Sequence, residues 1–468
     1  MSGAVFLFGK DLRLTDNYGL NNALKENEQI LPLYVWDRFF PPPNRFVKSW
    51  LLNSLHELGN GLGRIGSRLT VRSGDTANIL TNICLQLGIN KVYVTEPTYT
   101  LGSMEYEKLK HILNCQGVTL VLIRDNNLRF ISKEPEIRQF KQFQNLILRE
   151  MKVGPVTEIN QFSSLLSINT LEKDVFDFGE TRSRVDFGNS WSPGWEHANS
   201  KMNIIDSVDF VNNYKCNRQS LDESRAIRLS PYLVNGEISY NTIFYRGSRQ
   251  AKEIDSGENP FLRQICWNLF AKHTYKHNPN LHTHSIRPVI DQLPWTSSVD
   301  GLKKWKEGLT GYPIVDAGMR ELRQTGWIHN RIRMITASFL IKHLLVHWTE
   351  GADWFYDNLL DADVPSNYFN WQYMAGSMRE SNPYFRIFNP VLQGKKFDPN
   401  GKYVKRWIPE LRDYPKQLIH EPWKYNPVKT RTNSFQKRKI YPEPVVEHMF
   451  ARTRALSMFR KYLKKGDN

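Results

Sequence analysis

Carboxylate and amide side chains gather in the segment DADVPSNYFNWQYMAGS, which begins at Asp361. Asp361 and Asp363 are separated by one residue, and Asn367 follows shortly after them. Paired carboxylates are typical of general acid and base catalysis or of a metal site. The structural alternative is a loop that enters a helix, with Asp363 or Ser366 as the N-terminal cap. The residues alone leave both interpretations open.

Cationic side chains concentrate in two other segments. In TGWIHNRIRMITASFLIKHLLVHW, Asn330, Arg331, Arg333 and Met334 crowd one helical turn ahead of a long apolar stripe. Such a turn suits a ligand, but it also suits a buried helix whose arginines extend to the surface. In YKCNRQSLDESRAIRLS, which ends at Ser230, three arginines and two serines lie just before an apolar run; they are Arg218, Arg225, Arg228, Ser224 and Ser230. They indicate phosphate binding at a helix start or, as the residues alone favour, an ordinary N-cap with solvated arginines.

The elements that must position these side chains differ along the chain. The first 125 residues alternate helix-like stretches with short apolar runs, namely Ala4–Phe8, Ile30–Trp36, Leu69–Arg72, Lys91–Thr95 and Thr119–Ile123. This alternation predicts a parallel α/β sheet of Rossmann-like type. The first strand is not followed by G-x-G-x-x-G, and G-x-x-x-x-G-K-[ST] is missing, so we expect no ordinary dinucleotide site in this domain.

Residues 126–200 mix Ser, Asn, Gly and Pro with short apolar fragments and predict a long connection between domains. Residues 201–468 have helical periodicity and predict an all-α domain. A closing helix is predicted by the spacing of its apolar residues, which are Val446, Met449, Leu456, Phe459 and Leu463.

Composition narrows the class of partner. The chain of 468 residues carries 63 Lys and Arg against 47 Asp and Glu, a formal charge of +16 that favours nucleic acid, although solubility alone also explains it. Thirteen Trp suit stacking on bases or on a planar cofactor. The four cysteines show no C-x-x-C pair, so we expect neither a zinc site nor disulfides. No long apolar segment occurs near Met1, and we expect a cytoplasmic protein without membrane contact.

Four motifs carry a family resemblance. The runs GYPIVDAGMRELRQTGWIHNRIRMITASFLIKHLLVHW, NWQYMAGS, NPYFRIFNP and WIPELRDYP resemble the FAD-binding domain of the DNA photolyase and cryptochrome family. The resemblance runs through essentially the whole chain and is strongest from Tyr214 to Trp423. It implies an FAD cofactor, ultraviolet-damaged DNA as partner, a monomer and no metal. The chain is most similar to class I-type cyclobutane pyrimidine dimer photolyases, with some features of DASH-type cryptochromes.

The resemblance also implies which residues surround the flavin. They are Tyr214, Ala226, Ile227, Arg228, Leu229, Ser230, Arg333, Asp361, Ala362, Asp363 and Asn367. Ala226 and Ile227 replace the two hydroxyl residues usual in the phosphate segment, so backbone N–H groups would do more there. Arg333 and Asp361 match the pair that flanks the isoalloxazine. Asn367 matches the residue beside flavin N5, where plant cryptochromes typically carry Asp and animal ones Cys, so this position resembles a photolyase.

Three tryptophans match the family's electron-transfer chain, by which the flavin is photoreduced from solvent: Trp371, Trp348 and Trp295. For any one of them, an ordinary core residue is the alternative. The resemblance further implies a damaged-base pocket formed by Arg218, Gln264, Trp267, Asn330, Arg331, Met334, Tyr373 and Gln393. Gln264, Tyr373 and Asn268 depart from the Glu, Trp and Arg usual in cyclobutane-dimer photolyases, which weakens that activity.

The expected activity is therefore light-driven repair of cyclobutane pyrimidine dimers by electron transfer from excited reduced FAD. The alternative is a cryptochrome photoreceptor, including the DASH type, with the same flavin and tryptophans. Six-four photolyases carry histidines at the positions of Asn330 and Met334, so six-four repair is not expected. The antenna loop PTYTLGSMEYE matches neither the folate nor the deazaflavin pattern well, and a second chromophore of either type stays open.

Overall fold

The computed structural model describes ten stretches of the chain, and every statement below concerns these stretches alone. They are residues 3–37, 42–95, 102–123, 134–159, 185–222, 225–251, 259–296, 298–378, 386–424 and 441–463. The chain divides into two compact units. Unit 1 comprises residues 1–215 and 227–279, and unit 2 comprises residues 216–226 and 280–468. Each unit is described by itself.

Unit 1 begins with a five-stranded parallel sheet, as the alternating pattern predicted. Its strands have the order β3-β2-β1-β4-β5. Their bounds are β1 Gly3–Phe8, β2 Gln29–Asp37, β3 Thr70–Gly74, β4 Lys91–Thr95 and β5 Thr119–Ile123. The crossovers are helical, and their bounds are α1 Tyr18–Glu26, α2 Arg45–Arg64, α3 Thr76–Leu87 and α4 Gly102–Cys115. The parallel α/β prediction is confirmed.

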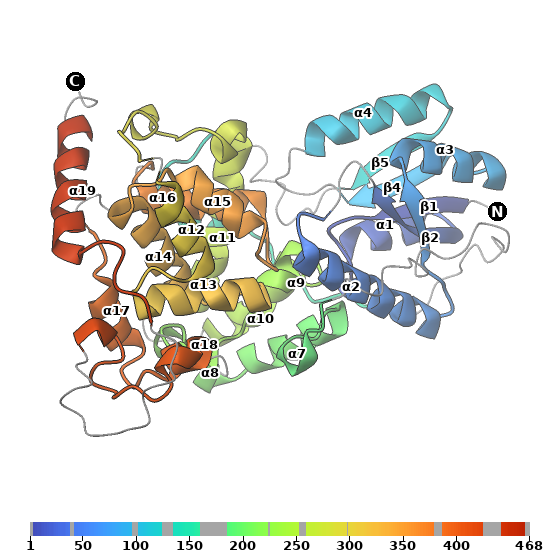
Figure 1. Cartoon of the computed structure of the whole chain (residues 1–468). Coiled ribbons are helices and arrows are strands. Elements are labelled where there is room, and N and C mark those ends of the chain that lie inside the picture. Colours follow the sequence, from blue (N-terminus) through green and yellow to red (C-terminus); the bar gives the residue numbers. More distant parts are fainter. Residues whose placement is uncertain are drawn as a thin grey trace. The chain divides into compact units, whose positions relative to one another are not determined.

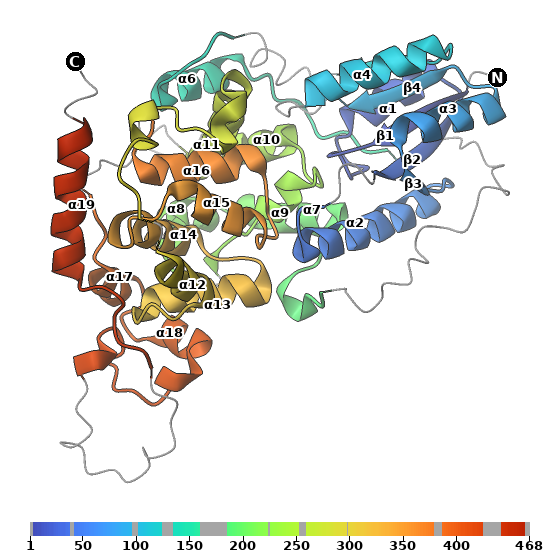
Figure 2. The same ribbon diagram turned by 45° about the horizontal axis from the view of Figure 1, so that its top comes forward.

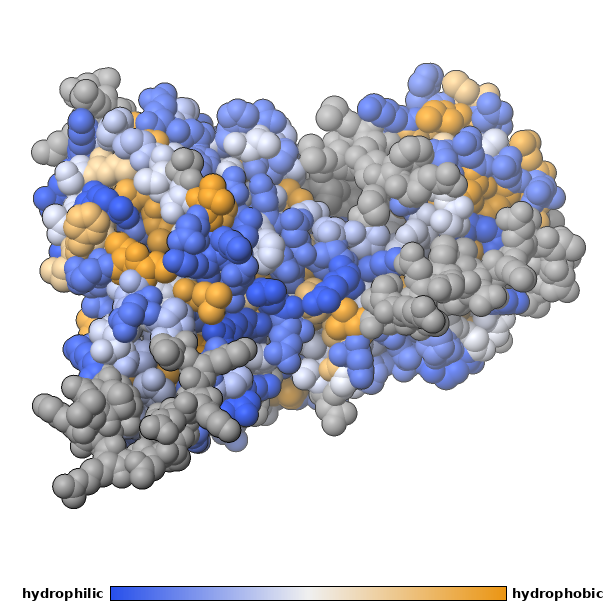
Figure 3. Space-filling view, in the orientation of Figure 1, coloured by the Kyte–Doolittle hydropathy of each residue, from blue (hydrophilic) through white to orange (hydrophobic). Residues whose placement is uncertain are grey.

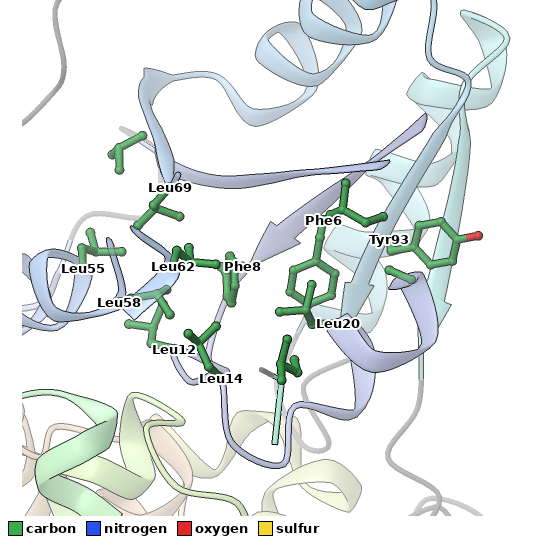
Figure 4. Packing of buried hydrophobic residues seen from close by; sticks show 14 of the residues in the cluster. Phe6, Phe8, Leu12, Leu14, Leu20, Leu55, Leu58, Leu62, Leu69 and Tyr93 are labelled. Carbon is green, nitrogen blue, oxygen red and sulfur yellow. The ribbon is translucent and has the colours of Figure 1, made fainter. Parts of the chain in front are cut away.

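Side chains alternate between the two faces of this sheet because successive residues of a strand point to opposite sides. Phe6 and Phe8 pack with leucines of α1 and α2 on one face, as Figure 4 shows for Leu20, Leu58 and neighbouring residues. The central strand β1 also sends Val5 and Leu7 to the other face, where they pack against α3 and α4. Figures 1 and 2 show these two helix layers on opposite faces of the sheet.

The rest of unit 1 is helical. Its elements are α6 Phe140–Glu150, the 3-10 turn η3 Gly188–Ser190, α7 Trp195–Ile205, α8 Val208–Asn217, α9 Ser230–Val234, α10 Tyr240–Ala251 and α11 Pro260–His277. Helix α8 runs two residues past the border of the unit. Helix α6 lies within the segment expected to be a connection, and it packs against α11.

Unit 2 is helical throughout its described residues, as predicted. Its helices are α12 Val299–Glu307, α13 Pro313–Thr325, α14 Asn330–Ser338, α15 Trp348–Tyr356, α16 Val364–Ala375, α17 Pro390–Phe397, α18 Lys402–Trp407 and α19 His448–Leu463. A π-helical turn, η7 Phe339–His343, continues α14. Short 3-10 turns are η5 Pro279–His282, η6 Pro288–Ile290, η8 Pro409–Leu411 and η9 Pro422–Lys424.

Two helices of unit 2 begin with the same local signal. Asp363 caps α16 and Asn389 caps α17, each through side-chain acceptance of backbone N–H groups, and a proline occupies the first turn of each helix. The N-cap side chain accepts a hydrogen bond from a backbone N–H of the first turn, which has no partner within the helix. Proline in the first turn has no N–H, so it leaves one fewer donor unpaired. These caps fix where the site-bearing helices start.

The closing helix differs in part from its prediction. Helix α19 starts at His448, so Val446 lies before it, and Met449 is 57% exposed. The buried stripe is formed by Ala451, Ala455, Met458 and Phe459. Small alanines let the helix approach its neighbours closely, and a search for large apolar residues overlooks them.

Candidate functional site

An ion pair between Arg333 and Asp361 is the most constrained charged contact of the predicted site. Arg333 Nη2 lies 3.0 and 2.8 Å from the two carboxylate oxygens of Asp361, and Arg333 Nε donates to the Ile328 carbonyl at 3.0 Å. The Asp361 side chain is 4% exposed, whereas that of Arg333 is 23% exposed. The contacts therefore hold a cation and an anion in fixed positions, with part of the guanidinium left accessible.

The two carboxylates of DADVPSNYFNWQYMAGS, Asp361 and Asp363, have different structural roles. Asp363 accepts hydrogen bonds from the backbone N–H of Ser366 at 3.2 Å and from its hydroxyl at 2.6 Å. Its capping role is the structural alternative that the sequence left open. Ala362 lies between the two aspartates and is buried. Because Asp361 is paired with a guanidinium and Asp363 is a cap, the segment is not an acid–base pair.

Asn367 lies on α16 and is 8% exposed. Its amide nitrogen donates to the Ala352 carbonyl at 2.8 Å, which fixes the side chain against α15. No residue in the described stretches donates to the amide oxygen. Asn367 thus presents a nearly buried, uncharged hydrogen-bond acceptor that has no proton to give up.

Trp371 packs closely against α15 because Gly351 has no side chain. A Cβ at Gly351 would overlap the six-membered ring of Trp371, with only 2.5 Å to Cζ3. Trp371 also contacts Phe355 and Trp305, with ring centroids 5.0 and 6.1 Å apart. Sequence patterns alone did not single out Gly351, because a glycine inside a helical pattern indicates a close approach only when its partner is known.

Trp348 starts α15, three residues before Gly351, and it is fully buried. His347 lies between Trp348 and Trp295, with its ring centroid 5.6 Å from the former and 5.4 Å from the latter. The structure thus brings the three predicted tryptophans to one region of unit 2, at and beside α15. His347, which the sequence reasoning missed, contacts the rings of both Trp348 and Trp295.

Three predicted lesion contacts of unit 2 lie in the first turns of α14, and two others lie on α16 and α17. The amide nitrogen of Asn330 is 4.0 Å from the sulfur of Met334, so the two side chains lie together one turn apart. The Arg331 guanidinium lies over the ring of Phe397, 4.6 Å from its centroid. Tyr373 on α16 and Gln393 on α17 are half-buried.

These residues belong to a region with a strong positive charge. Burial and the nearby Arg218 and Arg386 guanidinium groups lower the pKa of Arg331. His329 accepts the backbone N–H of Arg331 at 3.0 Å, and burial, opposed in part by a hydrogen bond to the Arg218 backbone, lowers its pKa to about 4. His329 is therefore a neutral imidazole at neutral pH, and the charge of the region comes from arginines.

Two predicted lesion contacts lie on α11 in unit 1. Trp267 stacks on Phe140 with ring centroids 3.8 Å apart and an interplanar angle of 3°. Gln264 lies one turn earlier on the same helix, and both are half-buried. Asn268 accepts a hydrogen bond from the Tyr240 hydroxyl at 2.5 Å. Phe140 was missed because its helix α6 fell within the predicted connection.

The predicted phosphate segment also falls in unit 1, except for Ala226, the last residue of a stretch assigned to unit 2. Arg228 has a left-handed backbone, with φ of +54°, and its guanidinium lies 3.8 Å from the ring centroid of Trp191. Ile227 is half-buried, Leu229 is buried, and Ser230 begins α9. Tyr214 lies 5.3 Å from Phe210, measured between ring centroids.

Among the residues that the structure covers, no three His, Cys, Asp or Glu side chains gather as metal ligands. No helix in the described stretches is both long and apolar enough to cross a bilayer. Hydrophilic side chains cover much of the face in Figure 3, and apolar ones gather in separate patches.

The donors and acceptors of unit 2 suit a reduced flavin. A reduced flavin ring carries negative charge and an N–H group at N5. A fixed guanidinium from Arg333 and an uncharged acceptor from Asn367 complement those two features. The buried ion pair of Arg333 with Asp361 limits how far the cation can move.

Comparisons with known proteins agree with this chemistry. Residues 261–461 match the family model for the FAD-binding domain of DNA photolyase, and residues 4–152 match that for DNA photolyase. The chain is 34% identical to a deoxyribodipyrimidine photo-lyase of Agrobacterium fabrum, covering 97% of this chain and 96% of the relative. It is 31% identical to cryptochrome-1 of Arabidopsis thaliana, covering 95% of this chain and 68% of the relative.

A solved structure supports the same assignment. The crystal structure of a bacterial class III photolyase from Agrobacterium tumefaciens superposes with a TM-score of 0.89 at 32% identity. The match covers 99% of this chain and 98% of that chain. With its parallel sheet, its helical region and its FAD-binding domain, the chain belongs to the DNA photolyase and cryptochrome family.

Proposed function

We propose that this protein repairs cyclobutane pyrimidine dimers in ultraviolet-damaged DNA, using light and reduced FAD. The observation that carries the proposal is the environment of Asn367. An amide fixed to the Ala352 carbonyl cannot protonate flavin N5, and this favours the fully reduced anionic flavin that dimer repair requires. Nearly full-length similarity to deoxyribodipyrimidine photo-lyases supports the same activity.

Arg333, Asp361 and Asn367 would hold the flavin ring, and the segment from Ala226 to Ser230 with Tyr214 would contact its phosphates. When bound, FAD supplies the light absorption and the single electron that opens the dimer. The protein's own part is electrostatic and steric: the Arg333–Asp361 pair sets the charge beside the ring, and burial of Asn367 and Asp361 excludes water.

Recognition of the lesion requires the damaged dinucleotide to leave the DNA helix, which costs a few kcal/mol and costs least for damaged bases. Aromatic stacking returns roughly 1 to 3 kcal/mol per base. By the family resemblance, Trp267 and Tyr373 each offer a ring on which a flipped base would stack. Asn330 and Met334 offer an amide and a thioether, which suit intact pyrimidine rings.

Six-four repair needs a proton donor beside the lesion. His329 is the histidine at the start of α14, and its pKa of about 4 keeps it neutral, with Nδ1 occupied as an acceptor. An imidazole in this state is a poor acid. The neutral His329 thus adds a physical reason to assign the dimer rather than the six-four lesion.

Illumination of the reduced enzyme with oligonucleotides that each carry one lesion tests the proposal. Chromatography of the products should show restored thymines from the cyclobutane dimer and none from the six-four lesion. Repair of six-four lesions alone would overturn the assignment. Repair of neither lesion, with FAD bound and photoreducible, would move the protein to the cryptochrome photoreceptors.

Gln264 offers a sharper version of this test. A protonatable carboxylate stabilises the radical anion of the dimer better than an amide does, so Gln264→Glu should raise the repair quantum yield. The matched control is Gln324→Glu on the exposed face of α13, which should leave the yield unchanged. An unchanged yield in Gln264→Glu would remove Gln264 from the proposed contacts.

The antenna chromophore stays a prediction. Residues 97–101 of the predicted antenna loop lie outside the described residues. An absorption spectrum of the purified protein should show FAD in near one-to-one amount, and any additional band would identify a folate or a deazaflavin.

A further inference from the structure

The three tryptophans of the proposed electron chain differ in what accepts their indole N–H. Trp295 donates to the backbone carbonyl of Ile290 at 2.9 Å. Trp371 has no acceptor among the residues that the structure describes. Trp348 donates to the hydroxyl of Ser285 at 2.8 Å, and Ser285 in turn donates to the carboxylate of Asp291 at 2.5 Å. Of the three, only Trp348 has a hydrogen-bonded path to a Brønsted base.

This path leads from the interior toward solvent. Trp348 is 0% exposed and Ser285 is 6% exposed, whereas the Asp291 side chain is 30% exposed. The other Asp291 oxygen accepts the backbone N–H of Ser285 at 2.9 Å, and His347 Nε2 lies 3.2 Å from Oδ1. These contacts hold the carboxylate at the end of the path.

A proton path matters here because oxidation makes an indole acidic. Removal of one electron from the ring weakens the N–H bond, and the radical cation that forms is a charge in a fully buried site. An uncompensated buried charge is costly. Loss of the proton to Asp291 would remove the charge from the ring and leave a neutral radical, which takes its electron back less readily.

We propose that Ser285 and Asp291 form a proton outlet for Trp348, so that the chain of tryptophans stores the oxidised state as a neutral radical on its middle member. Like the proposed function, the proposal rests on the family resemblance, which assigns an electron-transfer chain to Trp371, Trp348 and Trp295. Trp348 gives one electron to Trp371 after Trp371 has lost one electron to the light-excited oxidised flavin. The Nε1–H bond then breaks with its electron pair kept on nitrogen, the proton passes to Ser285 Oγ, and the Ser285 hydroxyl proton passes to Asp291 Oδ1.

His347 is a positioning residue in this arrangement. Its ring contacts both Trp348 and Trp295, and its Nε2 lies beside the Asp291 carboxylate. His347 therefore holds the Asp291 carboxylate and the rings of Trp348 and Trp295 in one geometry.

Flash excitation of the FAD-loaded protein with transient absorption tests the outlet, because the radical cation and the neutral radical of tryptophan absorb at different wavelengths. In the wild type, the neutral radical should appear on a buried indole, and its formation should slow in deuterium oxide. In Ser285→Ala and Asp291→Asn the neutral form should be lost, and the radical cation should decay by charge recombination. Asp300→Asn removes an exposed carboxylate that pairs with Lys304 instead, and this variant should behave as wild type.

The wild-type isotope effect keeps the test independent of whether the variants fold. A wild type in which the radical stays a cation, or forms the neutral radical equally fast in both solvents, overturns the outlet while leaving the electron chain intact. The absence of any tryptophan radical in the wild type overturns the outlet and the proposed chain together. Retention of the neutral radical in a folded, FAD-loaded Ser285→Ala variant overturns the path through Ser285.

Discussion

Trp267 and Trp348 show two ways of holding a functional aromatic ring. Trp267 in unit 1 is half-buried and lies flat on Phe140, a contact made through ring faces. Trp348 in unit 2 is fully buried, and its N–H is tied to the Ser285 hydroxyl. Stacking on a rigid partner holds a ring in position for a substrate, whereas burial with a hydrogen-bonded nitrogen controls the charge on the ring.

The difference indicates how the helices divide the work. Helix α11 is supported from behind by α6, so that the stability of a contact surface depends on packing between two helices. The stability of the region around α15 instead depends on close packing at one position. Trp371 occupies the space that a side chain at residue 351 would need, and Gly351 has none. The following predictions test these two kinds of support, beginning with the largest expected effect.

Trp371→Phe should abolish photoreduction of the oxidised flavin, because phenylalanine is far harder to oxidise than tryptophan. Repair by chemically reduced enzyme should remain largely intact, which separates electron supply from dimer splitting. Absorption spectra during blue-light illumination measure the first, and product chromatography measures the second. Trp407→Phe on α18 is the matched control, and unchanged photoreduction in Trp371→Phe would exclude Trp371 from the chain.

Acid should destabilise unit 1 through His273, which is fully buried. Burial, with the nearby His277 and Lys276, lowers its pKa from 6.5 to about 4. Its Nε2 also accepts the backbone N–H of Ile137 at 2.9 Å. The folded pKa lies below the unfolded one, so the unfolded state binds the extra proton and stability is lost as pH falls from about 6.5 toward 4.

The expected loss between pH 7 and pH 5 is about 2 kcal/mol in the free energy of unfolding. Urea titrations at the two pH values measure it. His273→Gln should reduce the loss relative to the wild type. An equal pH dependence in both proteins would show that His273 is not responsible.

Phe140→Leu should weaken binding of damaged DNA without removing any residue from the proposed contact surface. Aromatic pairs contribute about 0.5 to 1.5 kcal/mol beyond their buried area, so affinity should fall by about fivefold. Fluorescence anisotropy with a lesion-bearing duplex measures the change. Phe143→Leu is the control in the same helix, since Phe143 packs on Phe270 rather than on Trp267. Equal effects of the two variants would argue that α6 acts through general stability.

Arg218→Gln should have the smallest effect, because it removes one phosphate contact from a region that also contains Arg331 and Arg386. The slope of log affinity against log salt should become shallower by about 0.9. Binding titrations at several salt concentrations measure the slope for duplex DNA. A slope identical to the wild type would place Arg218 outside the DNA contact.

Local sequence patterns were sufficient for much of the fold. The bounds predicted for Lys91–Thr95 and Thr119–Ile123 agree with β4 and β5, because short apolar runs between turn signals are typical of buried parallel strands. Helix α6 was overlooked, although Phe140, Phe143 and Ile147 recur at helical spacing. The polar residues, glycines and prolines elsewhere in the predicted connection obscured that periodicity.

The candidate site was predictable only where the family motif names a residue. The ion pair of Arg333 with Asp361 was expected, and the structure brings the two together. Ser285 and Asp291 were not expected, since they lie about sixty positions before Trp348 and only the tertiary fold joins them. Partners that are distant in sequence, as Phe140 is from Trp267, carry no local signal.

The absence of a side chain at Gly351 constrains how this chain can diverge. Any replacement there would collide with the ring of Trp371, so a mutation at Gly351 is tolerated only after Trp371 has become smaller. The order of the two substitutions therefore matters, and the two sites form an epistatic pair. Leu340 Cδ2 also lies 2.5 Å from the position of that Cβ, so a lineage that lost Trp371 would need a shift of the Leu340 side chain as well. Alignment of such sequences should then show larger residues accumulating at position 351.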